Sequence, residues 1–273
     1  MTVEHTRNRM PQRRRGALSL LRHTIAARRL ACLLLALLAP CGDARARTFD
    51  EFQVYDGRIA EPGNFDYDQH VVLGRRGRTS DGGAPRNGLL VMPEVGYATT
   101  TWHEVAVYLP VAREFSGDVF GGGFKLRNTF VTPKAEGRPV AGGLDAEIRH
   151  QSTRFSEANW AMTVRPIIDF RTGPWQLILN PSLEIPFGRD SPAFAPAVRG
   201  ARQVSDNVWL GVEHYMDFGR VDRWETARRQ GQQLFAVTDI RFSERVALNA
   251  GLGHGLTRNS DRWVGKLILR VDF

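Results

Sequence analysis

The chain has 273 residues, 42% of them hydrophobic and 24% charged, a composition that fits a folded domain and excludes a disordered or collagen-like chain. Its formal charge of +8 is concentrated at the N-terminus, because residues 1–46 contain nine arginines and two acids and leave +1 for the remainder. That remainder interleaves both signs of charge, whereas a nucleic-acid binder needs clustered cations that displace phosphate counterions. A nucleic-acid partner is therefore not expected.

Residues 1–46 have the layout of a secretory signal peptide. A basic stretch comes first, an apolar run covers residues 30–38, and small residues lead to Ala46, after which cleavage is predicted. The apolar run is far shorter than the roughly 20 residues of a membrane-spanning helix. We therefore expect an exported mature chain that begins near Arg47.

Both cysteines, Cys32 and Cys41, lie in this leader, so the mature chain is expected to contain neither a disulfide nor a thiolate metal ligand. Two alternatives stay open. The residues before Cys41 have a faint likeness to a lipobox, in which the cysteine is lipidated, although Pro40 stands where a small residue is usual. The long basic stretch also leaves open a start codon near Met10.

From residue 64 onward, stretches of about ten residues alternate apolar with polar side chains, and turn-forming residues separate them. None keeps the 3.6-residue period of a helix, so this part of the chain is predicted to be all-β. The twelve expected strands are 64–74, 88–98, 102–110, 121–131, 141–150, 158–171, 174–186, 193–204, 208–217, 231–242, 246–255 and 262–273.

Alternation of this kind fits two folds. A soluble β-sandwich turns its apolar face inward, and a membrane β-barrel turns it outward. The connections favour the barrel, because tight ones such as Thr172-Gly173 and Ser205–Asn207 alternate with long ones such as Arg75–Asn87 and Phe218–Gln230. Outer-membrane barrels combine short periplasmic turns with longer outer loops in this way.

The end of the chain adds a second argument for the barrel. Leu267, Leu269, Val271 and Phe273 alternate along the last segment, and this pattern resembles the C-terminal signal that the barrel-assembly machinery recognises. Aromatic residues collect near segment ends, where an interfacial girdle would lie. They are Trp102, Tyr108, Trp160, Phe170, Trp175, Phe187, Trp209, Tyr215 and Trp263.

We therefore predict an antiparallel transmembrane β-barrel of about 12 strands in the outer membrane. Residues 1–46 are the expected signal peptide, residues 47–63 a periplasmic segment, and residues 64–273 the barrel. Four prolines inside the predicted strands count against this assignment, because each removes a ladder donor. They are Pro93, Pro166, Pro181 and Pro196.

Several short runs resemble a known group of proteins. They are residues 49–57 (FDEFQVYDG), 61–63, 102–106 (WHEVA), 125–128, 165–167, 180–181 and 260–263 (SDRW). These runs are similar to proteobacterial hypothetical outer-membrane β-barrel proteins near the MetA-pathway-of-phenol-degradation barrel family. The resemblance spans the mature chain and implies an outer-membrane barrel, but it assigns no substrate and no functional residues.

One motif has the spacing of a catalytic pair. His150-Gln151-Ser152 resembles the His-x-Ser pair of outer-membrane phospholipase A, another twelve-stranded barrel, where the serine is the nucleophile and the histidine its base. A period of two places both side chains on one face. Thr153-Arg154 follows where that family has Asn-Gly, so polar residues at the barrel rim are the preferred explanation. A phospholipase-like hydrolase stays the lesser alternative to a protein without enzyme activity.

Neither a cofactor nor a metal site is expected. Gly251, Gly253 and Gly255 alternate on one predicted strand without a preceding βα turn, which indicates close packing rather than a nucleotide-binding loop. The remaining histidines lack a partner at metal-ligand spacing. They are His70, His103, His214 and His254.

The predicted inward faces carry charges of both signs. Those expected to line the lumen are Glu104, Arg127, Glu147, Arg165, Asp169, Arg171, Glu184, Glu213, Asp239, Arg241, Lys266 and Arg270, with Glu94, Lys125, Asp145, Arg149, Arg199 and Asp217 in the same phase. Such charges can pair across strands and close the lumen, or line a narrow path, because unpaired buried charge is costly. We expect Arg165 and its strand neighbours to pair with Glu147 or Glu184.

Two functions stay open. The first is a narrow outer-membrane channel for small solutes, including hydrophobic or aromatic ones. The second is a plugged barrel that acts as a structural element or through its outer loops. In either case the expected partners are outer-membrane lipid and lipopolysaccharide and the barrel-assembly machinery, with a small-molecule solute in the first.

Overall fold

The computed structural model describes residues 50–75, 87–115, 117, 119–133, 138–152, 158–188, 191–257 and 259–273. The expected signal peptide, both cysteines and the predicted cleavage site lie outside these residues. Within the described ranges, no helix has the length and hydropathy that a membrane crossing requires. The regular structure described below is antiparallel β.

The strands follow one another along the chain and form one sheet. They are β1 (Phe65–Arg75), β2 (Asn87–Thr100), β3 (His103–Tyr108), β4 (Val111–Glu114), β5 (Val119–Gly121), β6 (Phe124–Val131), β7 (Val140–His150), β8 (Trp160–Thr172), β9 (Trp175–Asn180), β10 (Leu183–Pro186), β11 (Ala193–Phe194), β12 (Ala197–Ser205), β13 (Val208–Asp217), β14 (Gly219–Arg220), β15 (Arg223–Trp224), β16 (Gly231–Arg241), β17 (Val246–Gly255) and β18 (Trp263–Asp272).

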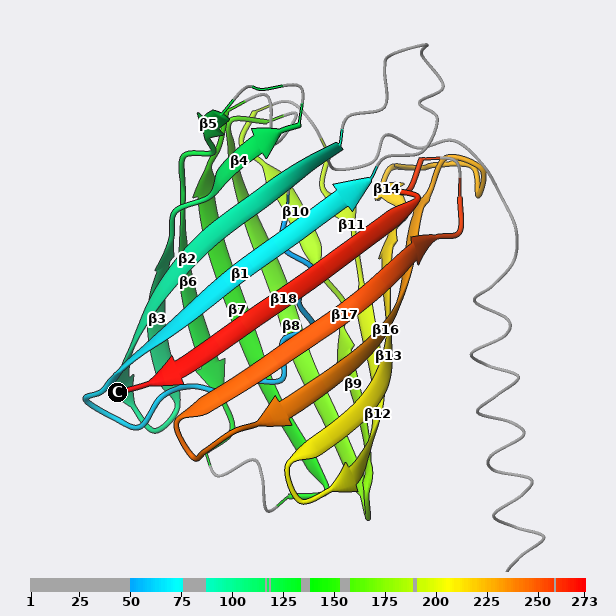
Figure 1. Ribbon diagram of the computed structural model, residues 1–273. Helices are drawn as coiled ribbons and strands as arrows, with labels where there is room; N and C mark the ends of the chain where they lie inside the picture. Colours follow the sequence, from blue (N-terminus) through cyan, green and yellow to red (C-terminus); the bar gives the residue numbers. More distant parts are fainter. Residues whose placement is uncertain are drawn as a thin grey trace, which may run out of the picture. The chain divides into compact units, whose positions relative to one another are not determined.

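The sheet closes into a barrel of 12 strands. β1 pairs with β2 on one side and with β18 on the other, so the first and last strands complete the ring. Figure 1 shows β1 and β18 side by side. Four of the barrel strands consist of two successive pieces (β3 and β4, β5 and β6, β9 and β10, β11 and β12), and β14 with β15 forms an additional hairpin. The prediction of an all-β antiparallel barrel is confirmed.

Buried and exposed side chains alternate along the strands, with the arrangement that a membrane barrel requires. Large apolar side chains such as Leu126, Leu144 and Leu267 are exposed on the outer face, while charged side chains such as Glu104 and Lys125 are buried inside. A soluble sandwich would show the opposite arrangement, with the apolar side chains inside. The outer surface therefore suits hydrocarbon, and the interior is polar.

The two ends of the barrel differ in the length of their connections. At the turn end, residues 101–102, 173–174 and 206–207 join neighbouring strands, within two residues of the tight connections predicted from the sequence. The opposite loop end includes the longer connections between β1 and β2 and between β13 and β16. Phe273 lies at the turn end, where its backbone N–H donates to the Phe65 carbonyl oxygen at 3.0 Å (Figure 1).

The prolines lie where the ladder is interrupted. The registers of β8 with β9 and of β9 with β12 bring Pro166, Pro181 and Pro196 opposite one another, at the breaks between β9 and β10 and between β11 and β12. Pro93 faces the break between β3 and β4, where the Leu109 N–H donates to its carbonyl oxygen at 3.1 Å. The strands thus accommodate residues that cannot donate by interrupting regular pairing beside them.

The aromatic girdle was predicted correctly for most, but not all, of its members. Trp102, Trp160 and Trp263 are exposed on the outer face near strand ends. Tyr108, Trp209 and Tyr215 were wrongly included. Tyr108 is fully buried, Trp209 lines a cavity of the lumen under Arg241, and Tyr215 packs against inward-facing Phe235. All three side chains belong to the interior phase of their strands. The position of a residue along a strand does not reveal which face it occupies.

The N-terminal segment lies elsewhere than predicted. Residues 47–63 were assigned to the periplasm, whereas residues 50–60, termed the inner segment below, contact side chains inside the barrel. The physical reason is that inward-facing cations and amides hydrogen-bond to this segment and thereby avoid burial without partners.

Candidate functional site

Residues of β6, β9 and β18 hold the inner segment. Lys125 of β6 bonds to Asp50 and Glu51, Lys266 of β18 donates to the Phe52 carbonyl oxygen at 3.0 Å, and Asn180 of β9 pairs with both backbone groups of Tyr55. The Tyr55 N–H donates to Asn180 Oδ1 at 2.8 Å, and Asn180 Nδ2 donates to the Tyr55 carbonyl oxygen at 3.0 Å. The segment is therefore fixed by its backbone as well as by its charges.

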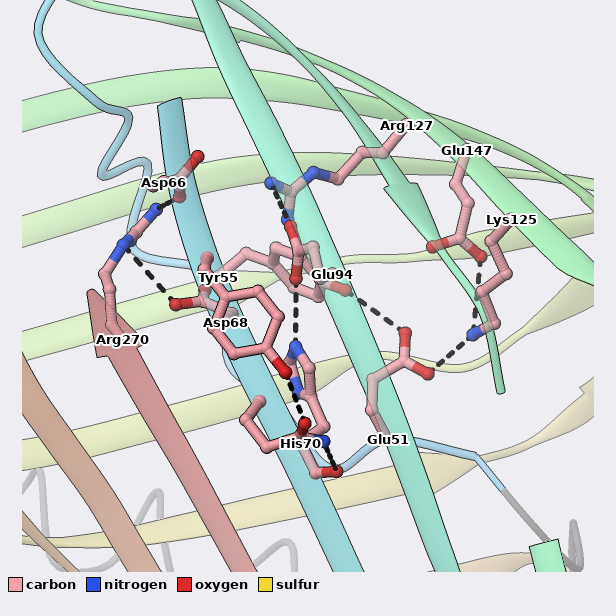
Figure 2. Close-up of polar contacts among 12 residues, drawn as sticks. Glu51, Tyr55, Asp66, Asp68, His70, Glu94, Lys125, Arg127, Glu147 and Arg270 are labelled. Carbon is pink, nitrogen blue, oxygen red and sulfur yellow. Dashed lines mark hydrogen bonds and ion pairs between the residues drawn. The ribbon is translucent and has the colours of Figure 1, made fainter. Parts of the chain in front are cut away.

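The Lys125 ammonium is the ionic anchor of the segment. Its Nζ lies 2.6 Å from Asp50 Oδ1. It also lies 2.5 Å from Glu51 Oε2 and 3.7 Å from Glu147 Oε1 (Figure 2). Burial, and next the Asp50 carboxylate, raise the pKa of Glu51 to about 8. At neutral pH this carboxyl group is thus mostly protonated, and an additional cation beside it would favour its ionised form.

A second group of charges surrounds Arg127 on the neighbouring strands. This Arg127 cluster consists of Asp66, Asp68, His70, Glu94, Glu104, Arg127 and Arg270. Arg127 Nη2 lies 2.6 Å from Glu94 Oε1 and 3.0 Å from Glu104 Oε1, and Glu104 Oε2 accepts the Ala60 N–H at 2.8 Å. Arg270 pairs with Asp66 (Figure 2). The cluster therefore joins β1, β2, β3, β6 and β18 to the inner segment.

The Arg127 cluster also contains the residues that could hold a metal ion. Ligand atoms of Asp68, His70 and Glu94 lie within 4.8 Å of one another, and His70 Nε2 is 2.9 Å from Glu94 Oε2. Sequence spacing missed this group, because the antiparallel register of β1 and β2 sets Asp68 opposite Glu94. The guanidinium groups of Arg127 and Arg270 already contact the two carboxylates, so a metal ion would have to compete with them.

Aromatic rings also hold the inner segment in place. The Phe52 ring centroid lies 5.2 Å from that of Tyr215 and 5.0 Å from that of Phe235. A Cβ added to Gly253 would lie 2.6 Å from the Phe235 ring, so glycine is required at this point of β17 to admit the ring. The alternating glycines thus indicate close packing, as predicted.

The other charges predicted to line the lumen form pairs or contact aromatic rings at further points. Lys266 pairs with Glu213, Arg199 with Asp239, and Arg149 with Glu184. Asp169 and Arg171 pair with each other on β8, and Arg241 lies over the Trp209 ring, 5.1 Å from its centroid.

Arg165 does not have the predicted partner. Its Nη1 lies 2.9 Å from Asp145 Oδ2, directly across the β7–β8 pair, rather than beside Glu147 or Glu184. Its guanidinium carbon is 3.9 Å from the centroid of the Tyr55 ring. The sequence predicted the facing of this side chain but not its partner, because the register of the two strands decides the partner.

The described contacts do not assemble the predicted catalytic pair. His150 lies on the outer phase of β7, where its ring is 4.6 Å from Trp160 and 6.0 Å from Phe124 between centroids. No hydrogen bond joins it to Ser152 among the described residues, and the Ser152 hydroxyl is buried without a partner there. Packing against aromatic residues near the barrel rim accounts for His150.

The inner segment separates two cavities in the barrel. The loop-end cavity has a volume of about 160 Å³ and is lined by residues 50–53 and 55 together with parts of β7, β8, β13 and β16. The turn-end cavity has a volume of about 800 Å³ and is lined by residues 53–54 and 56–62 together with parts of β16, β17 and β18. Gln53 lines both cavities.

The two cavities differ in charge. Six carboxylates and one cation, Arg165, line the loop-end cavity. The carboxylates are those of Asp50, Glu51, Glu147, Glu184, Asp217 and Asp261. Five acids and six bases line the turn-end cavity. The loop-end cavity is therefore acidic, whereas the turn-end cavity is nearly balanced.

Comparison with known proteins identifies the fold. No protein-family model and no curated protein matches the chain. It is similar to the COG4313 outer membrane channel from Pseudomonas putida F1, with a TM-score of 0.60 and 13% identity over 82% of this chain and 100% of that chain. The chain has the fold of an outer-membrane β-barrel. The predicted resemblance is confirmed at that level.

Two autotransporter structures are more distant matches. The translocator domain of NalP from Neisseria meningitidis has a TM-score of 0.45 and 10% identity over 81% of this chain and 92% of its own. The transport unit of AIDA-I from Escherichia coli has a TM-score of 0.46 and 8% identity over 84% of this chain and 94% of its own.

Reversing the charge of Arg165 is expected to destabilise the barrel. Glu in its place would face the fully buried Asp145, at a cost of a few kcal/mol where water does not screen the pair. The exchanged pair, Arg165→Glu with Asp145→Arg, should recover most of the loss. Urea titration in lipid bilayers, followed by heat-modifiable gel mobility, measures both. If Arg165→Glu keeps its stability and only ion selectivity changes, water fills this part of the lumen.

Proposed function

We propose that this chain is an outer-membrane channel for small solutes, including ones with an apolar or aromatic part, and that the inner segment narrows its lumen. The observation that carries the proposal is the position of the inner segment, which lies between a cavity toward the loop end and a larger one toward the turn end. A barrel that served only as a scaffold would need neither cavity, because paired charges can fill the interior.

The remaining parts of the proposal follow from the sequence and the outer surface. A signal peptide cleaved near Ala46 would deliver the chain to the periplasm. The barrel-assembly machinery would insert it, and the exposed apolar side chains of the outer face would contact lipid and lipopolysaccharide. No enzyme activity is included, since the His150–Ser152 pair is not assembled among the described contacts.

Planar-bilayer recording tests the channel directly. We expect the mature protein to give small, discrete current steps in KCl, and a variant without residues 50–60 to give steps several times larger, because the deletion joins the two cavities. A variant with Leu144→Val on the outer face serves as a control that should conduct like the unaltered protein. If neither the mature protein nor the deletion variant conducts, although both migrate as folded barrels, the plugged structural barrel is the better description.

A further inference from the structure

We propose that the loop-end cavity binds small organic cations, in which a primary ammonium group is attached to an apolar body of about one ring. This inference rests on the proposed channel function and deepens it, because it names the class of solute that the lumen would admit. Three features of the cavity support it: a wall with more acids than bases, a buried acceptor without a described donor, and an aromatic wall of suitable size.

The described wall of the loop-end cavity has six acids and one base, Arg165. Lys125 contacts Asp50, and Arg149 contacts Glu184. Glu51 is mostly protonated at neutral pH, so the negative charge of the wall is smaller than its number of acids. Arg165, the cation on the wall itself, is already paired with Asp145. Carboxylates confined in a poorly hydrated cavity attract a mobile cation and repel anions.

Glu147 provides a specific acceptor for the ammonium group. Its side chain is 2% exposed, and its Oε1 is 3.7 Å from Lys125 Nζ. Its Oε2 has no hydrogen-bond partner among the described protein groups, and in Figure 2 this oxygen points away from Lys125. The buried Oε1 of Gln53, which also lines the cavity, likewise has no described donor. Because an ammonium group offers three N–H donors and no acceptor, it suits such a set of atoms.

The volume and the aromatic wall of the cavity determine the size and the apolar character of the ligand's body. Phe52, Tyr55 and Tyr215 line the cavity beside the carboxylates. A cavity of about 150 Å³ is large enough for one benzene molecule, and the loop-end cavity has about 160 Å³. Aromatic side chains also stabilise a neighbouring cation through their ring faces. An ammonium group carrying one ring therefore fits better than a bare inorganic cation or a larger solute.

The test is a calorimetric titration of the mature protein in an uncharged maltoside detergent at neutral pH. The four probes share one ring: benzylammonium, benzyltrimethylammonium, benzyl alcohol and benzoate. We expect benzylammonium to bind about tenfold or more tightly than benzyl alcohol, since a charge-assisted hydrogen bond is worth that factor. Benzyltrimethylammonium, which has the charge without N–H donors, should bind more weakly than benzylammonium, and benzoate should not bind.

A matched pair of variants places the binding in the loop-end cavity. Glu147→Gln keeps the shape of the side chain and should weaken benzylammonium binding about tenfold or more. Asp239→Asn removes a carboxylate from the turn-end cavity and should change the affinity less than about twofold. Heat-modifiable gel mobility shows whether each variant is folded. The comparison of the four probes on the unaltered protein remains decisive even if Glu147→Gln does not fold.

Two results would overturn the proposal. One is equal binding of benzylammonium and benzoate by the unaltered protein. The other is an unchanged benzylammonium affinity in folded Glu147→Gln. Failure of the cation site is distinguishable from failure of the channel. Potassium conductance without benzylammonium binding would support the channel and refute the cation site. Benzylammonium binding without potassium conductance would support the cation site and refute the channel.

Discussion

Replacing Arg127 with Met is expected to lower the free energy of unfolding by about 3–5 kcal/mol, because it removes a cation from buried acids. Arg127 Nη2 contacts both Glu94 and Glu104, and its guanidinium carbon lies 5.3 Å from the centroid of the Tyr108 ring. Without it, Arg270 is the one arginine left in the Arg127 cluster, beside four buried carboxylates. Methionine fills much of the same space, so the loss reports charge rather than volume.

A surface arginine gives the control for this experiment. Arg202→Met changes an exposed side chain that lies over Trp175 on the barrel wall, and its effect should stay within about 0.5 kcal/mol. Urea titration in phospholipid bilayers measures both variants. A loss below about 1 kcal/mol for Arg127→Met would show that water screens the cluster, and the interior would then be more open than its burial indicates.

Several features of the fold could be predicted from the sequence because they depend on a period of two. Side chains alternate strictly between the two faces of a strand, so Arg165 and Asp169 could be assigned to the polar phase without knowledge of their partners. The partners could not be predicted. Pairing depends on register across strands, and Arg165 consequently meets Asp145 rather than the predicted Glu147.

The inner segment escaped prediction for a different reason. Residues 50–60 have no strand-like alternation, and their contacts join distant parts of the chain: Lys266 and the Phe52 carbonyl oxygen are 214 residues apart. One signal was present in the sequence. A lysine on the inward phase of a strand, such as Lys125, requires acids near it, and Asp50 and Glu51 were available just before the first strand.

The role of the glycines could be predicted from the sequence only in part. Alternating glycines on β17 were correctly assigned to close packing, but the ring that they admit, Phe235, lies on the neighbouring strand β16. Gly96 is a second case. A Cβ at this position would lie 2.0 Å from Asp66 Oδ1, so glycine leaves the space for the acid that pairs with Arg270. Gly96 and Asp66 lie opposite each other in the register of β1 and β2, and this register could not be predicted from the sequence.

Replacing Phe273 with Asp is expected to reduce the amount of assembled barrel in cells severalfold while leaving the stability of refolded protein nearly unchanged. Phe273 is 64% exposed, so its side chain adds little packing to the folded barrel. Its backbone N–H bonds to the Phe65 carbonyl oxygen, and aspartate can make the same bond. Leu267, Leu269 and Val271 precede it on one face of β18, the pattern proposed as the assembly signal.

Phe242→Asp is the matched control, because Phe242 is 61% exposed at the turn end between β16 and β17 but lies outside the proposed signal. Heat-modifiable mobility of outer-membrane fractions measures assembly, and refolding into lipid vesicles measures stability. Recognition by the assembly machinery requires that Phe273→Asp lose assembled barrel and that Phe242→Asp keep it. An equal loss in both variants would mean that a charge near the membrane interface, rather than recognition of the last strand, limits insertion. A parallel loss of refolding by Phe273→Asp alone would instead assign the residue to closure of the barrel between β1 and β18.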